Sequence, residues 1–165
     1  MLPPDADAIE SAITLANQFH HQQRDSDGAP YILHLLRVML ACKSPLAKQA
    51  GVLHDLLEDT TATTDDILNA GLSQSLVDVL QLLTHAKDTP YASYILQLAK
   101  NPIATEVKIA DLEDNYQIRR VKYRPNSPTT DALRLQRYIL SHRFLNGELS
   151  SESYLQSMAD LESNP

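Results

Sequence analysis

The sequence contains little cysteine, glycine or aromatic residue, and it lacks long apolar runs. Cys42 is the only cysteine among 165 residues, which excludes an internal disulfide and predicts a buried thiol in a reducing, cytoplasmic compartment. The longest apolar stretches fall far short of the ~20 residues that a membrane span requires. The N-terminus shows neither a basic region nor a long apolar stretch, so we expect no signal peptide and no membrane partner.

The residues that are abundant favour helices. Hydrophobic residues make up 43% of the chain and are rich in leucine and alanine, which are strong helix formers. Aromatics are only 5%, and β-branched runs are nearly absent. The length suits one core, so we expect a single all-α domain over residues 1–165. The net charge of −7 argues against DNA or RNA binding, whereas a small phosphorylated ligand needs only a cation and a few local lysines or arginines. The oligomeric state is left open.

Capping residues and prolines divide the chain into helices. Asp5 caps a first helix to about Gln23, and Pro30 opens a second. A Ser-Pro pair at 44–45 begins a third helix, which we expect to run to about Glu58 and to be the most buried, because it is apolar on most sides. Similar signals predict further helices from near positions 63, 73, 90 and 102. The C-terminal helices, within 128–163, are expected to start at Ser127-Pro128 and near position 151.

An ionisable pair, His54-Asp55, lies inside the most apolar helix. Burying such a pair is costly unless something compensates it. A divalent cation is the simplest compensation, since imidazole and carboxylate both bind Mn, Fe or Zn, and bundle interiors commonly hold such sites. Glu58 follows one turn later on the same face, where it can orient or deprotonate a metal-bound water, and Asp59 comes next.

Further ligands must come from other segments, because a cation needs more than two. Asp111 is the best candidate, since it lies in a helix whose other inward residues are apolar. Lys108 and Asn115 share its face, which places an acid for metal, a cation for phosphate and an amide for hydrogen bonding on one stripe. His34, amid the leucines of the second helix, is the fourth candidate ligand.

Each of these residues also has a structural interpretation. A lone histidine such as His34 is more often a hydrogen-bonded core residue. Glu58 and Asp59 alone are typical of a solvated helix end, and Lys108 alone of a lysine that extends to solvent. The metal site is favoured because one ion explains all of these features together.

Three separated strings carry a resemblance to a known family. They are GAPYILH at 28–34, LHDLLEDT at 53–60 and KIAD at 108–111. In this order and spacing, over residues 20–115, they resemble the hydrolase domain of the RelA/SpoT alarmone enzymes and the stand-alone small alarmone hydrolases. These are HD-domain phosphohydrolases.

The resemblance implies an HD-domain helical bundle and a metal-dependent phosphohydrolase. The family reaction removes the 3′-pyrophosphate from guanosine tetra- or pentaphosphate, with a metal that activates water and polarises the phosphoryl oxygen. It implies that Glu58 and Asp59 help to activate water and that Asn115 faces the nucleotide. The ion is usually manganese, with iron, zinc, cobalt or nickel as alternatives, and its implied ligands are His34, His54, Asp55 and Asp111.

One part of the family pattern differs. Alarmone hydrolases carry an Arg-Lys pair that contributes to the guanine and phosphate pocket, and here the corresponding residues are Asp25 and Ser26. Arg24, one position earlier, is the candidate to bind substrate instead. The substrate therefore stays open between an alarmone, another nucleotide and a different small phosphorylated compound. Alternatives from other classes are a non-catalytic nucleotide-binding module and a structural helical protein with a His-Asp network in its core.

Overall fold

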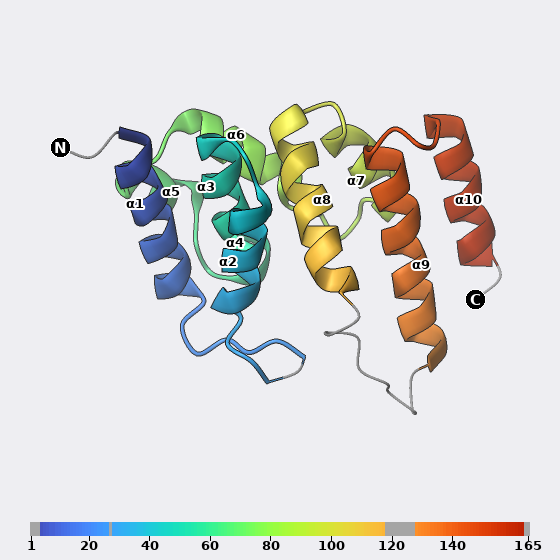
Figure 1. Ribbon diagram of the computed structural model, residues 1–165, viewed down its shortest axis with the longest axis horizontal. Coiled ribbons are helices and arrows are strands. Elements are labelled where there is room, and N and C mark those ends of the chain that lie inside the picture. The colour runs from blue at the N-terminus through green and yellow to red at the C-terminus, as the bar shows by residue number, and fades with distance from the viewer. Residues whose placement is uncertain (1–3, 27, 118–127, 164–165) are drawn as a thin grey trace.

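The computed structural model describes residues 4–26, 28–117 and 128–163. In these ranges the regular structure is helical, and the only extended pairing is an isolated bridge between Arg24 and Pro30. The predicted all-α class is confirmed. The helices are α1 (Pro4–Phe19), α2 (Ile32–Ala41), α3 (Pro45–Leu53), α4 (Leu56–Asp59), α5 (Thr64–Asn69), α6 (Gln74–Leu83), α7 (Tyr91–Leu98), α8 (Pro102–Tyr116), α9 (Pro128–Leu145) and α10 (Ser151–Ser163) (Figure 1).

Side-chain caps fix the starts of several helices, as predicted. Ser44 accepts a hydrogen bond from the amide of Ala47 at the start of α3, and Ser73 caps α6 in the same way. Asn101 accepts from two amides at the start of α8. These side chains satisfy N–H groups that have no partner within the helix.

Helix α3 lies at the centre of the packing. It contacts α1, α2, α6 and α8, and most of its residues are buried, which confirms the prediction. Gly51 allows α2 to come close, because a Cβ built at this position would lie 3.1 Å from the Cα of Met39 and 3.2 Å from the Sγ of Cys42. The thiol of Cys42 is buried, and this burial raises its pKa to about 12.

The third helix ends earlier than predicted. It stops at Leu53 instead of reaching Glu58, and the chain turns through His54 and Asp55 before α4 begins. In a continuous helix the amide of Asp55 would bond to the carbonyl of Gly51. That carbonyl is instead 2.8 Å from Nδ1 of the His54 ring, and Asp55 adopts φ −96° and ψ 1°. The His-Asp pair therefore sits at a helix break, not inside a helix.

Two other boundaries also differ from the prediction. Helix α1 ends at Phe19, short of Gln23, and the following turn contains Gln22 with a φ of +65°. Helix α2 begins at Ile32, because Pro30 is held in the bridge to Arg24. The resulting loop carries Tyr31 up to the start of α2, next to the candidate site.

The C-terminal helices extend the bundle. Helix α9 packs against α8 and α10, and α10 also reaches α7; Figure 1 shows α8 between α2 and α9. Tyr154 and Met158 of α10 are buried and join the same core as α1 to α8. The predicted cap Ser127 lies outside the described residues. None of the helices in the described ranges has the length and apolarity that crossing a membrane requires.

Candidate metal centre

Three of the predicted ligands converge from three helices. His34 lies on α2, His54 follows the last residue of α3 and Asp111 lies on α8. One donor atom from each lies within 4.8 Å of the others. The Oδ1 of Asp111 is 3.4 Å from Nε2 of His34 and 3.5 Å from Nε2 of His54. All three residues are buried.

The fourth predicted ligand, Asp55, lies beside this group. Its Oδ2 is 3.1 Å from Nε2 of His54 and 3.8 Å from Nε2 of His34. The hydroxyl of Tyr31 donates to the same oxygen at 2.5 Å. Although burial opposes ionisation, the positive charge of His54 lowers the pKa of Asp55 to about 2. Asp55 is therefore a carboxylate at neutral pH.

The donor set fits a divalent cation. The Nε2 of His54 is buried and, apart from its 3.1 Å contact with Asp55, has no hydrogen-bond partner among the described residues, while Nδ1 is engaged with the Gly51 carbonyl. A carbonyl can only accept, so Nδ1 carries a hydrogen, and Nε2 is the nitrogen that can offer a lone pair to a cation once the ring is neutral. The ring of His34 turns its Nε2 to the same point. Two imidazole nitrogens and two carboxylates are suitable ligands for Mn, Fe or Zn.

The electrostatics of the centre also favour positive charge. Burial lowers the pKa of His54, but the neighbouring carboxylates Asp55 and Asp111 outweigh it and raise that pKa well above its usual value. Burial opposes ionisation of Asp111, yet the ammonium of Lys108 and both histidines hold its pKa well below the usual range. The cluster thus carries ionised carboxylates that attract a cation.

The two predicted catalytic residues lie on α4, one turn beyond the break. Both Glu58 and Asp59 are exposed. Oε2 of Glu58 accepts a hydrogen bond from the amide of His85 at 2.9 Å. Partial burial and the carboxylates of Asp55 and Glu58 raise the pKa of Asp59. These positions leave both carboxylates open to a water or a substrate.

The predicted substrate-binding residues fall into two groups. Lys108 donates to Oδ2 of Asp111 at 2.8 Å, and Asn115 donates to its Oδ1 at 2.6 Å. Both therefore hold Asp111 in place, and their contacts with a substrate remain predictions. Arg24 is not brought to the centre: its side chain is exposed, and among the described residues no hydrogen bond or ion pair joins it to the ligand set.

Sequence reasoning missed three residues around the centre. Tyr31 bonds to Asp55, Asp114 bonds to Nδ1 of His34 at 2.6 Å, and Arg37 bonds to Asp114. Helical spacing was the available signal, because Asp114 lies three residues after Asp111 and Arg37 three after His34.

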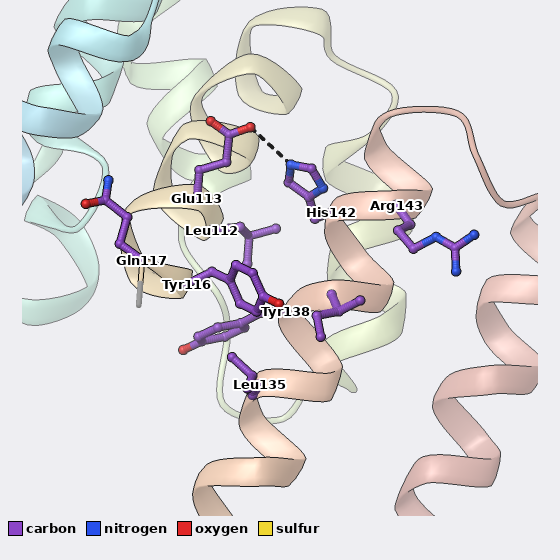
Figure 2. Close-up of a pocket in the computed structure, with 9 residues that line it drawn as sticks. Leu112, Glu113, Tyr116, Gln117, Leu135, Tyr138, His142 and Arg143 are labelled. Carbon is purple, nitrogen blue, oxygen red and sulfur yellow. Dashed lines mark hydrogen bonds and ion pairs between the residues drawn. The ribbon is translucent and has the colours of Figure 1, made fainter. Parts of the chain in front are cut away.

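A separate apolar cleft of about 600 Å³ lies between α8 and α9. Figure 2 shows its labelled side chains, with a 3.1 Å contact between Glu113 and His142. Leu112 and Tyr116 line it from a face of α8 different from that of Asp111. The cleft is therefore not part of the metal centre.

Comparisons with known proteins show what the sequence and the fold are similar to. No protein-family model matches the chain. A guanosine-3′,5′-bis(diphosphate) 3′-pyrophosphohydrolase of Aquifex aeolicus is 29% identical over 124 residues, which cover 68% of this chain and 18% of that protein. A GTP pyrophosphokinase of Streptomyces antibioticus is 30% identical over 148 residues, which cover 82% of this chain and 18% of that protein. The chain is similar to the RelA/SpoT-type hydrolase domain.

The similarity extends to the fold but covers only part of the relatives. The solved structure of a metazoan SpoT ortholog that hydrolyses ppGpp matches with a TM-score of 0.69 and 19% identity, over 98% of this chain and 96% of that one. This match shows that the chain shares the fold of that protein. The chain spans only 18% of the length of the Aquifex and Streptomyces relatives. The resemblance predicted from the sequence is confirmed.

Proposed function

We propose that this protein is a metal-dependent phosphohydrolase whose substrate is a guanosine 3′,5′-bis(diphosphate)-type nucleotide and which releases its 3′-pyrophosphate. The observation that carries the proposal is the convergence of His34, His54 and Asp111, whose donor atoms lie within 4.8 Å of one another. The names of the relatives support the choice of reaction. Manganese is the proposed metal, held by these three residues together with Asp55.

Different residues of this chain perform different steps of such a reaction. A bound divalent ion supplies Lewis-acid chemistry, lowering the pKa of a water and polarising a phosphoryl oxygen. Glu58 or Asp59 takes the proton of the attacking water, since both carboxylates are exposed and close to the helix break at His54 and Asp55. Lys108 keeps Asp111 ionised. Asn115 orients Asp111 and is proposed to face the nucleotide.

A second candidate is hydrolysis of another nucleotide or small phosphorylated compound. The observation that favours it is the acidic residue Asp25 in the loop before α2, where the family carries a basic pair. Oδ1 of Asp25 accepts a hydrogen bond from the amide of Ala29 at 2.9 Å. This carboxylate therefore stabilises the loop, and unlike the family's basic pair it brings no positive charge to a phosphate. The two candidates share one reaction class and differ in substrate.

The test is turnover with a defined panel. Purified protein with Mn²⁺ is incubated with ppGpp, nucleoside mono- and triphosphates and NADPH, and released phosphate and pyrophosphate are measured. We expect Glu58→Gln to lower kcat by about 10²–10⁴-fold, the usual contribution of a general base, with Mn²⁺ affinity retained. Glu152→Gln, an exposed glutamate on α10, is the matched control and should leave kcat unchanged.

Each alternative gives a different result. Release of pyrophosphate from ppGpp supports the first candidate, and turnover of another compound alone supports the second. Tight nucleotide binding without any turnover favours a non-catalytic binding module. Failure to bind Mn²⁺, with full stability in chelator, favours a structural His-Asp network and refutes the proposal.

A further inference from the structure

The carboxylate of Asp114 lies behind His34, on the side of the ring away from the ligand cluster. Its Oδ2 is 2.6 Å from Nδ1 of His34, and both side chains are only 2–3% exposed. A carboxylate only accepts, so Nδ1 carries the hydrogen and donates a hydrogen bond to Asp114. Nε2, which lies 3.4 Å from Asp111, is then the nitrogen that faces the ligand cluster and can bind a cation. Asp114 thus sets both the tautomer and the orientation of this ring.

Arg37 holds Asp114 in turn. Its Nε donates to Oδ1 at 2.6 Å and its Nη2 to Oδ2 at 3.1 Å. Such a two-point contact fixes the plane of the carboxylate as well as its position. Asp114 is 3% exposed, whereas the Arg37 side chain is 38% exposed. Arg37 therefore supplies a permanent positive charge to a buried carboxylate that otherwise would be costly to keep ionised.

The pair also connects the two helices that carry ligands. Arg37 lies on α2 one turn after His34, and Asp114 lies on α8 one turn after Asp111. Each member thus lies one helical turn from a proposed ligand. The Arg37–Asp114 contact therefore joins α2 and α8 next to the contact between His34 and Asp111.

We propose that Arg37 and Asp114 are a positioning pair for the metal centre. Arg37 fixes Asp114, and Asp114 holds the imidazole of His34 with Nε2 toward the cation. This inference rests on the proposed metal-dependent function, but it concerns metal binding and not the identity of the substrate. A merely structural clamp between α2 and α8 would change the stability of the metal-free protein, whereas a positioning pair changes the affinity for the ion.

A double-mutant cycle separates these roles. The variants are Arg37→Met, Asp114→Asn and the double mutant, and Mn²⁺ affinity is measured by titration calorimetry, with thermal unfolding in chelator as the readout of stability. Each single variant should weaken Mn²⁺ binding by about 10–100-fold, as loss of a residue that orients a ligand typically does. The double mutant should bind no more weakly than Asp114→Asn, because Arg37 acts through Asp114. Arg37→Lys keeps the positive charge but loses the two-point guanidinium contact, and it should recover part of the Mn²⁺ affinity.

The control is Arg143→Met, because Nε of Arg143 bonds to Glu148 at 3.0 Å on the exposed surface. This variant should bind Mn²⁺ like wild type. Wild-type affinity in Arg37→Met, or additive losses in the double mutant, would overturn the positioning role while leaving the proposed function intact. A wild-type protein that binds no Mn²⁺ would overturn both. Should Asp114→Asn fail to fold, Arg37→Met and Arg37→Lys alone decide, since equal affinity in Arg37→Met and wild type sinks the inference.

Discussion

Replacing Gly51 by alanine tests how closely helix packing controls the metal centre. The added Cβ would lie 3.1 Å from the Cα of Met39, whereas carbon atoms prefer about 3.5–4.0 Å. The backbone of α2 must therefore retreat by roughly 0.5 Å. Overpacking of this kind costs about 1–3 kcal/mol, and alanine returns about 1 kcal/mol through its higher helix propensity. We expect a net loss of about 1 kcal/mol and a Tm lower by about 2–4 °C.

The functional effect of this variant should exceed its effect on stability. His34 lies on α2 and His54 follows α3. A movement of α2 away from α3 therefore changes the separation of the two Nε2 atoms. Functional geometries tolerate only about 0.5 Å of displacement, and Mn²⁺ affinity should fall accordingly. Thermal unfolding in chelator and calorimetric titration measure the two effects. Val77→Ile is the control for added core volume outside α2 and α3, because it adds a carbon to the core on α6. An unchanged or higher Tm together with unchanged Mn²⁺ affinity in Gly51→Ala would refute the reasoning.

Two further predictions concern charge. Asp111→Asn should abolish tight Mn²⁺ binding and leave the helix content by circular dichroism unchanged. Because the partly buried Lys108 loses its charged partner, stability in chelator should fall by about 3 kcal/mol. Retained Mn²⁺ binding would contradict the ligand assignment. Hydrogen bonds from Thr63 lower the pKa of Asp66 below its usual 3.8. Ionised Asp66 therefore stabilises the folded state above pH 3.8, and this stabilisation is lost as the pH falls through the lowered folded-state pKa. Urea unfolding should show a stability difference between wild type and Asp66→Asn at about pH 6 that closes near pH 2; a difference of the same size at both values would argue against it.

The helix starts were predictable because their chemistry is local. Ser44, Ser73 and Asn101 bond to amides within the next three residues, so the pattern is visible in a short window of sequence. The break at His54 and Asp55 was not, because the apolar pattern continues across it. It depends on a ring nitrogen competing for the Gly51 carbonyl, which periodicity does not report.

The candidate site shows the same limit. His54, Asp55 and Asp111 could be predicted because ionisable residues in apolar helices need compensation. Arg37 and Asp114 were missed, since helical spacing shows only that each shares a face with a ligand and their contact joins positions 77 apart in sequence. Lys108 was assigned to phosphate from its stripe, and that assignment stays a prediction, but the bond of its ammonium to Asp111 was not foreseen. Partners across helices are set by packing, which the sequence of one helix does not contain.

The spread of the ligands along the chain bears on when an ion can be captured. A ribosome builds the protein from its N-terminus, so α2 and the turn at His54 emerge well before α8. A nascent chain that ends before Asp111 holds the two imidazoles and Asp55 but lacks the carboxylate that faces both imidazoles. The complete set of proposed ligands therefore forms only after α8 has been made and docked. Fragments truncated ahead of α8 should not compete with the finished protein for scarce metal in the cell.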